Sequence, residues 1–302
     1  MDLPRINRRA FLLTGAAAGT LKAAPASPRD DLLAIPDEGW RLWIDQAAAW
    51  EDDTIHLPGE FDLAALPVRL PSGGWEQLGS GLAVTLPATV EQHYWGKFGE
   101  APYTLDEYAL APKDSVPRNG AWRGVSWWSR DIEIPADFRG RKILLHVRGA
   151  RMRAEVFLNR QLVGYSILEE LPFECDISRA ADPGGRNHLA IRITNPGGRY
   201  DWVDGATIQW GKVRVQRSHG FGGLDRGIAL SAHPMDGRIA DLWVLNRPEA
   251  LRVRAFVRLE GGSHENLSIS LTDEATGHRL PAKIRFARHG PDGVCEFDVA
   301  AK

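Results

Sequence analysis

Apolar and polar residues alternate with a period of two through the middle of the chain, from Trp127 to Asn195. Between Trp127 and Ile134 the even-numbered residues fall on one side and the odd-numbered residues on the other. Short alternating runs bounded by Pro, Gly and Asn are typical of half-buried β-strands, because successive side chains of a strand point to opposite faces. The Asn159-Arg160 pair lies between two apolar runs and predicts a tight hairpin turn. The same alternation continues at residues 143–147, 154–158 and 189–194.

Shorter patterns extend this prediction in both directions along the chain. Residues 82–86, which end before Pro87, predict one strand, and residues 208–215 predict another. The tryptophan-rich segment 40–50 fits either a strand or one turn of helix. Four more alternating runs toward the C-terminus predict strands at residues 251–259, 267–271, 280–286 and 294–299. The chain is therefore predicted to be all-β.

A series of short motifs accompanies these strands in a fixed order over about seventy residues. The motifs are Trp128 with Arg130, Ile134-Pro135, Arg141-Lys142-Ile143, Val156 to Asn159, Val163-Gly164, Pro172-Phe173, Asp176-Ile177, and Gly185 through Asn187 to Leu189-Ala190. In this order and spacing they resemble the N-terminal sugar-binding domain of glycoside hydrolase family 2, the family of β-galactosidases, β-glucuronidases and β-mannosidases. Arg160 departs from the family, which usually has Gly at that position because the turn favours a positive φ. This departure puts the turn type in question and leaves the fold unchanged.

The resemblance implies a fold and a domain order. It implies a galactose-binding-like jelly-roll β-sandwich over residues 27–245, followed by a short or incomplete immunoglobulin-like β-sandwich over residues 246–302. Residues 239–244 resemble the last strand of the family's first sandwich, and residues 246–249 resemble a linker. A complete immunoglobulin-like domain has about 100 residues, so the second module is abbreviated or the chain is a fragment. Family 2 enzymes carry two catalytic glutamates on a (β/α)₈ barrel farther along the chain, so we assign no catalytic residue here.

Residues 1–26 predict an export signal rather than part of the fold. Arg8-Arg9 precedes an apolar run that resembles a twin-arginine signal, and Ala24-Pro25-Ala26 resembles a cleavage site. The apolar run is too short to serve as a permanent membrane span. We therefore expect a periplasmic or secreted protein without a stable membrane anchor.

The amino-acid composition limits the kinds of molecule that this chain is expected to bind. The chain has a net charge of −2, and removal of residues 1–26 takes away a net +3 and leaves −5. This balance argues against nucleic acid, because phosphate binding needs a basic face. The two cysteines, Cys175 and Cys295, lie far apart in the sequence and lack metal-ligand spacing, so we expect buried thiols. We expect neither a cofactor nor a metal.

Residues 196–230 carry the side chains best suited to bind a ligand. In family 2 the loop that matches residues 218–222 approaches the catalytic domain and touches substrate. Trp202 and Phe221 offer flat faces for sugar C–H groups, while Asp201 and His219 offer hydrogen bonds to hydroxyl groups. Gly220, Gly222 and Gly223 either let the backbone approach a ligand or only permit a bend. The predicted rim of a carbohydrate site consists of Asp201, Trp202, His219 and Phe221, with Arg226 bracing the bend or pairing with a neighbouring carboxylate.

Two other features remain open at this stage. The aromatic-rich stretch from Glu91 to Arg123 is long for a loop within a compact domain, and loops of this length are usually functional or disordered. Its aromatic residues argue against disorder. Adjacent acids such as Asp52-Asp53 are expected to lie in solvated turns.

Three hypotheses about function follow. The first is the non-catalytic, sugar-binding portion of an exported family 2 glycosidase, whose barrel would lie outside this chain. The second is a stand-alone carbohydrate-binding or structural sandwich protein. The third is an independent hydrolase that acts from residues 91–123 and 196–222, and a turnover assay would distinguish it from the other two.

Overall fold

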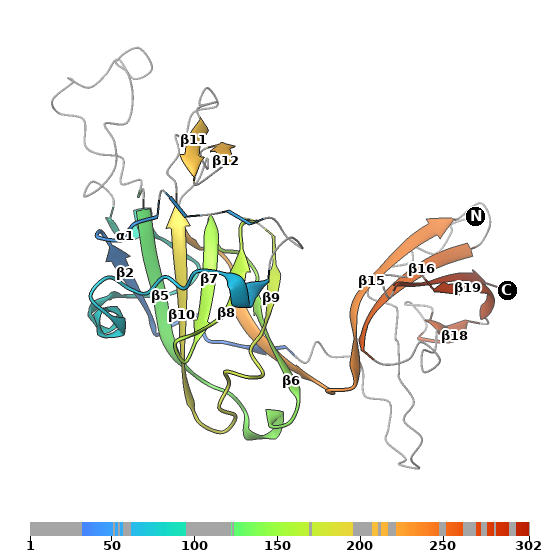
Figure 1. The fold of residues 1–302 in the computed structure, drawn as a ribbon. Helices are drawn as coiled ribbons and strands as arrows, with labels where there is room; N and C mark the ends of the chain where they lie inside the picture. Colours follow the sequence, from blue (N-terminus) through green and yellow to red (C-terminus); the bar gives the residue numbers. More distant parts are fainter. Residues whose placement is uncertain are drawn as a thin grey trace. The chain divides into compact units, whose positions relative to one another are not determined.

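A computed structural model describes residues 32–50, 52–53, 55–56, 62–94, 122, 124–168, 171–195, 207–210, 213–216, 222–247, 252–261, 270–272, 277–280, 282–289 and 294–301. The described chain forms two compact units, which divide between Ala232 and His233 (Figure 1). Both units are built from antiparallel strands, which confirms the all-β fold class. Within the described ranges no helix is both long and apolar enough to cross a membrane.

The first unit is a sandwich of two sheets. The larger sheet has six strands in the order β3-β2-β5-β10-β7-β8. These strands are β2 (Trp40–Asp45), β3 (Leu82–Val84), β5 (Gly124–Glu133), β7 (Arg153–Leu158), β8 (Gln161–Ser166) and β10 (Arg186–Asn195). Its centre is the pairing of β5 with β10, which joins Gly124 to Asn195 at one end and Glu133 to Arg186 at the other. Residues 40–45 are therefore a strand, which resolves the choice that the sequence left open.

The smaller sheet has four strands in the order β1-β14-β6-β9. Their bounds are β1 (Leu33–Ala34), β6 (Lys142–Val147), β9 (Phe173–Asp176) and β14 (Ile228–His233). The main core lies between the two sheets, where the inward residues of both, such as Trp128, Ile191 and Leu145, are almost completely buried. Short elements complete the unit: β4 (Ala88–Thr89), α1 (Val90–Tyr94), β11 (Thr207–Trp210), β12 (Val213–Gln216), β13 (Gly223–Leu224), and the 3₁₀ turns η1 (Leu63–Ala65), η2 (Trp75–Ser80) and η3 (Ala136–Phe138).

The larger sheet is buried on both faces near β5, which the alternating sequence pattern did not predict. Trp127 and Trp128 point to opposite faces, and both are 0% exposed. On the outer face Trp127 packs in a second apolar cluster with Trp50, Leu78 and Phe157. Trp75 contributes an edge-on contact to Trp127, with ring centroids 5.7 Å apart. The segment between β2 and β3 therefore covers this part of the sheet, so the first six residues of β5, expected to be half-buried, are buried on both faces.

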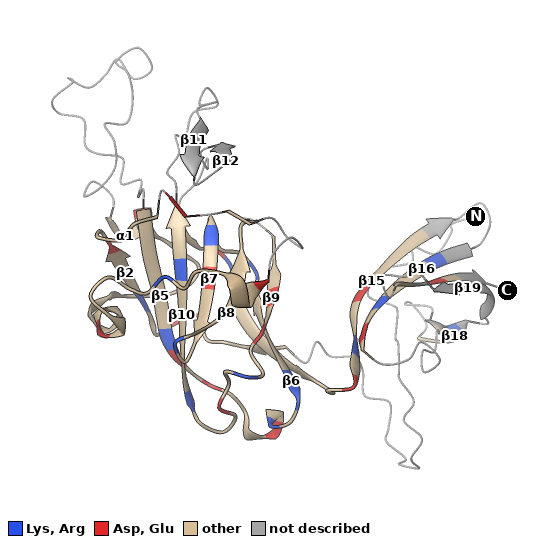
Figure 2. Cartoon of the chain, in the orientation of Figure 1, with Lys and Arg blue, Asp and Glu red and all other residues tan. Residues whose placement is uncertain are grey.

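Four charged side chains are buried beside this second cluster, and we call them the buried ion cluster: Asp53, Arg153, Glu155 and Arg192. The Asp53 carboxylate lies 2.7 Å from Arg153 and 3.3 Å from Arg192. Glu155 lies between the same two guanidinium groups. Burial alone would lower the pKa of Arg153, but Glu155 and Asp53 outweigh it and raise that pKa above its ordinary value. Figure 2 shows basic segments on the central strands β7 and β10.

The burial of Asp53 corrects one prediction from the sequence. Asp52 is exposed, as expected for a solvated turn, but Asp53 is 2% exposed. The physical reason is that two arginines from neighbouring strands, together with the half-exposed Arg69, compensate the charge of Asp53.

The hairpin between β7 and β8 has the expected tight turn, although Arg160 occupies the position where the family usually has Gly. Leu158 pairs with Gln161, so Asn159 and Arg160 form a two-residue connection. Their φ angles are 51° and 70°, the left-handed values that a primed hairpin turn requires at both positions. Asn159 stabilises the turn by donating to the carbonyl of Ala180 at 2.8 Å. The substitution of Arg for Gly therefore leaves the backbone conformation unchanged and adds a steric cost.

The second unit has a four-stranded sheet in the order β15-β16-β20-β19 and a separate pair, β17-β18. Their bounds are β15 (Gly237–Arg247), β16 (Arg252–Gly261), β17 (Leu271–Thr272), β18 (Arg279–Leu280), β19 (Ala282–His289) and β20 (Val294–Ala301). This short β-module lies where the resemblance implies an immunoglobulin-like sandwich. Residues 239–244 pair with β16 inside this unit. The expected domain boundaries at residues 27, 245 and 246 remain predictions.

Cys175 is a buried free thiol, as predicted, and Cys295 lies in β20 with its side chain outside the described part. Burial raises the pKa of the Cys175 thiol far above its ordinary value. Cys175 packs against Gly164 of the other sheet, where a Cβ atom would lie 2.0 Å from its Sγ. Gly164 thus allows the two sheets to approach closely at this point.

Candidate functional site

One end of the sandwich, where β5 begins at Gly124 and β10 ends at Asn195, adjoins in the sequence the segments that carry the predicted rim. Figure 1 shows the β11–β12 hairpin and the short helix α1 at the same end. The described residues that meet there are Glu91, Trp122, Asn195, Gly222 and Gly223. We refer to these five residues as the loop base, because the segments 95–121, 196–206 and 217–221 adjoin them in the sequence.

Residues 208–215 form a hairpin, so the prediction of a single strand was wrong. Thr207 pairs with Gln216 and Trp210 pairs with Val213. Gly211 lies in the sequence between the two paired strands, and Gly is a residue that commonly interrupts a strand pattern. A single eight-residue strand would separate its two ends by roughly 26 Å. The hairpin instead pairs Thr207 with Gln216, which follow Asp201 by six positions and precede His219 by three.

Four of the five predicted rim residues, Asp201, Trp202, His219 and Phe221, lie outside the described residues. Arg226 is described and exposed, in the turn between β13 and β14. Its side-chain stem lies against Gly149, where a Cβ atom would be 3.3 Å from Cγ of Arg226. The binding role of all five residues remains a prediction.

The glycine run has a packing role that the structure defines. A Cβ atom on Gly223 would lie 2.3 Å from the carbonyl oxygen of Ala88, so β13 can pair with β4 only with Gly at this position. A Cβ atom on Gly222 would lie 2.9 Å from Nδ2 of Asn195. Both glycines thus allow close packing within the protein, a role that the sequence analysis, which considered ligand approach or a bend, did not include.

Glu91 is the residue at this end that sequence reasoning missed. Thr89 and Gln92 form a reciprocal capping box, in which Gln92 N donates to Thr89 Oγ1 at 3.2 Å and Thr89 N donates to Gln92 Oε1 at 3.1 Å. This cap starts α1 and places Glu91 in its first turn, where the side chain is 1% exposed. Trp122 N donates to Glu91 Oε1 at 3.0 Å. The Thr-Val-Glu-Gln sequence signals the cap, but no local pattern signals burial of the acid.

The carboxyl group of Glu91 has an unusual acidity. Burial raises its pKa to about 7, against the opposing effects of backbone N–H groups, including those of Trp122 and Gly222, and of the Arg151 charge. The other carboxyl oxygen, Oε2, is buried and has no hydrogen-bond partner in the described part of the chain. A carboxyl group of this kind changes its protonation state around neutral pH.

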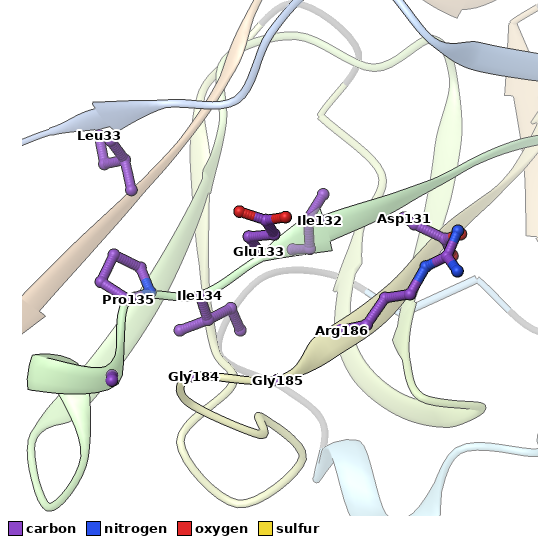
Figure 3. A pocket seen from close by; sticks show the side chains of 10 residues that line it. Leu33, Asp131, Ile132, Glu133, Ile134, Pro135, Gly184, Gly185 and Arg186 are labelled. Carbon is purple, nitrogen blue, oxygen red and sulfur yellow. The ribbon is translucent and has the colours of Figure 1, made fainter.

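A hollow of about 750 Å³ lies at the opposite end of the sandwich, beside the pairing of Glu133 with Arg186 (Figure 3). Its walls include Leu33, Ile132 and the Gly184-Gly185 backbone. Asp131, on the rim, bonds Arg186 at 2.6 Å and His188 at 2.9 Å. Burial would raise the pKa of Asp131, but these two partners outweigh it and lower that pKa. The lining has no aromatic face on which a sugar could stack, so we place the candidate site at the loop base.

Three polar side chains on neighbouring strands of the smaller sheet contact one another. The Ser231 Oγ lies 2.7 Å from His146 Nε2, and the His146 Nδ1 lies 3.4 Å from the Glu174 carboxylate. The order Ser-His-Glu matches that of a hydrolase triad, but Ser231 is 4% exposed and lies within strand β14. A nucleophilic serine of a triad needs an exposed turn and nearby donors for an oxyanion. The three residues therefore form a cross-strand polar ladder.

The described residues offer no evident metal site: within the described ranges no group of three or more His, Cys, Asp or Glu side chains is arranged to hold a metal ion.

Comparison with known proteins agrees with the architecture. The family model described as "Glycosyl hydrolases family 2, sugar binding domain" matches residues 27–234. A β-glucuronidase of Formosa agariphila is 25% identical over 171 residues, which are 57% of this chain and 16% of that protein. A β-galactosidase large subunit of Leuconostoc lactis is 25% identical over 246 residues, which are 81% of this chain and 32% of that protein.

Solved structures show the same fold. The β-glucuronidase of Ruminococcus gnavus, in complex with uronic isofagomine, has a TM-score of 0.53 at 18% identity. That alignment covers 91% of this chain and 39% of the other. The β-glucuronidase of Lactobacillus rhamnosus has a TM-score of 0.51 at 18% identity, with 90% and 39% coverage. The chain thus spans well under half of each of these relatives.

Proposed function

We propose that this chain, which belongs to glycosyl hydrolase family 2 through its sugar-binding domain, is the non-catalytic N-terminal portion of an exported glycosidase. The hydrolysis of O-glycosidic bonds would take place on a barrel outside this chain. The sandwich would present one rim to a β-glycoside ligand. The observation that carries this proposal is the match of the family model to residues 27–234, the range that contains the sandwich.

The loop base supports the position of the rim. The hairpin pairs Thr207 with Gln216, and Gly222 lies against Asn195. The two segments that carry the predicted sugar-contacting residues, 196–206 and 217–221, therefore begin or end at neighbouring points. Aromatic faces on Trp202 and Phe221 with polar groups on Asp201 and His219 would give the mixture of stacking and hydrogen bonding that sugars require.

The proposal does not specify which sugar the rim binds, because β-glucuronidases and a β-galactosidase are both among the similar proteins. A titration of the chain with glucuronate, galactose and mannose oligosaccharides, followed by NMR of the Trp indole N–H groups, tests binding and selectivity. We expect a Kd no tighter than about 1 mM, since about 4 kcal/mol is what a few such contacts leave after ordering costs.

The matched variants for this titration are Trp202→Ala and Trp243→Ala. We expect Trp202→Ala to abolish the shifts and Trp243→Ala, which changes a tryptophan of the second unit, to leave them intact. Shifts confined to Trp95 or Trp122 would move the site to residues 91–123. A complete absence of shifts would favour the structural alternative for the sandwich.

Two further consequences concern the whole protein. The proposal predicts that the coding sequence continues past Lys302 into a segment of about 250 residues, which is enough for a (β/α)₈ barrel. It also predicts export: N-terminal sequencing of the secreted product should begin near Ser27, and changing Arg8 and Arg9 to Lys should leave precursor in the cell. Unchanged export of that double variant would refute the twin-arginine route.

A further inference from the structure

The hollow at the end of β5 contains a carboxylate, that of Glu133, whose expected partner is engaged elsewhere. Glu133 and Arg186 pair directly across β5 and β10, an arrangement in which opposite charges ordinarily attract each other. The Arg186 guanidinium instead lies 2.6 Å from the carboxylate of Asp131. In Figure 3 the Arg186 side chain extends toward Asp131 and away from the Glu133 carboxylate. Within the described part of the chain, no side chain forms an ion pair with Glu133.

The interactions of Asp131 explain why Arg186 lies on that side. Arg186 bonds one oxygen of the Asp131 carboxylate, and His188 Nδ1 lies 2.9 Å from the other. Burial would raise the pKa of Asp131, but His188 and Arg186 outweigh it and lower that pKa, so the carboxylate is ionised at neutral pH. With His188 neutral, two carboxylates and one guanidinium give this rim a net charge of −1. The excess negative charge belongs to Glu133.

Apolar surface adjoins this charge. Leu33 lines the hollow with a side chain that is 44% exposed, and Ile134 and Pro135 follow Glu133 along the same wall. The volume of about 750 Å³ lies within the range of about 300–1,000 Å³ that is usual for small-molecule sites. A lone carboxylate beside aliphatic walls complements a cation that carries an aliphatic chain. It does not suit a metal ion, since within the described ranges no group of three acids, histidines or cysteines is arranged to hold one.

We propose that this hollow binds a small aliphatic ammonium ion, with Glu133 as its counter-charge and Leu33 and Pro135 as walls for the chain. The site is separate from the sugar rim and does not depend on the proposed function. Because one exposed ion pair contributes little, we expect a Kd of about 1–10 mM. The affinity should rise with the length of the aliphatic chain, by about tenfold from ethylammonium to pentylammonium if the three added methylenes are half-buried.

The experiment titrates the full chain, labelled with ¹⁵N, with pentylammonium chloride up to about 50 mM, at a constant ionic strength low enough to limit screening. The amide signals of Ile134 and Gly184 should shift with one common Kd. 1-Pentanol, which has the same chain without the charge, should bind about three- to fivefold more weakly. Glu133→Gln should weaken pentylammonium binding by the same factor. Glu76→Gln, which removes an exposed carboxylate outside the hollow, is the matched control and should leave Kd unchanged.

Two further variants test the role of Asp131 in keeping Arg186 away from Glu133. Asp131→Asn releases Arg186 to pair with Glu133 and should weaken pentylammonium binding about three- to fivefold. Adding Arg186→Met restores the net charge of the wild type and leaves Glu133 without a competitor, so the affinity should return to that of the wild type. Both side chains are exposed at the surface, so we expect the variants to fold.

Several results would overturn the proposal. An absence of shifts at Ile134 and Gly184 would show that the hollow does not bind the ammonium ion. Equal binding of pentanol and pentylammonium, or an unchanged Kd in Glu133→Gln, would show that Glu133 is not the counter-charge. Equal weakening by Glu76→Gln would reduce the effect to net charge alone. A double variant as weak as Asp131→Asn would contradict the competition between Arg186 and the ligand for Glu133.

Discussion

The buried ion cluster yields the most quantitative prediction for the sandwich. Glu155 is 0% exposed and lies between the guanidinium groups of Arg153 and Arg192. Glu155→Ala leaves two buried positive charges against Asp53 alone. Breaking a buried pair by removing one partner costs about 3–5 kcal/mol, because an uncompensated charge remains in the interior. That loss is a large part of the 5–15 kcal/mol that typically stabilises a folded domain.

Urea unfolding followed by tryptophan fluorescence measures this loss. With a urea m-value of about 2–3 kcal/mol/M, the midpoint for the first unit should fall by roughly 1–2.5 M. The control is Glu76→Ala, which removes a pair with Arg160 whose side chains are 76% and 62% exposed. An exposed pair of this kind contributes about 0–1 kcal/mol. If Glu155→Ala costs no more than Glu76→Ala, the cluster is not desolvated and the reasoning fails.

Three other substitutions test the local geometry of the sandwich. Arg160→Gly should raise the unfolding free energy by up to about 1 kcal/mol, since Gly takes a positive φ without steric cost; an unchanged or lower urea midpoint would contradict this. Gly164→Ala should lower the unfolding free energy by about 1–3 kcal/mol because the new Cβ atom clashes with Cys175, and adding Cys175→Ala should restore part of that loss. A double-mutant cycle in which the two effects simply add would argue against this contact. The pKa of Glu91 is about 7 in the folded state against an ordinary 4.5, so the folded state binds the proton more tightly than the unfolded state does. The free energy of unfolding should therefore fall by up to about 3 kcal/mol as the pH rises from 4.5 to 7, and stay level above that pH. Glu91→Gln should flatten this pH dependence, and an equal slope in both proteins would refute the assignment.

Local sequence patterns predicted the fold class and several of the strands correctly. Alternation placed β6, β7 and β10 to within a few residues, because the period of side chains in a strand is a local property. The motif order between Trp128 and Ala190 identified the family that the comparison supports. The hairpin turn at Asn159 was also a local signal, and the structure shows that it tolerates Arg160 at a positive φ.

The candidate site was only partly accessible from the sequence. The motifs pointed to residues 196–226, but the hairpin at residues 207–216 and the packing roles of Gly222 and Gly223 appeared only in the structure. The sequence did not mark Glu91 as a site residue, because its hydrogen-bond partner Trp122 lies 31 residues farther along the chain.

Tertiary structure alone decided which charges are buried. Asp53 resembles the neighbouring exposed Asp52 in sequence, yet its partners Arg153 and Arg192 lie 100 and 139 residues farther along the chain. Trp127 follows a half-buried pattern, yet the segment that carries Trp50 and Trp75 covers it from the outer face. Local alternation reports which way a side chain points, whereas burial and pKa depend on what the rest of the chain places against it.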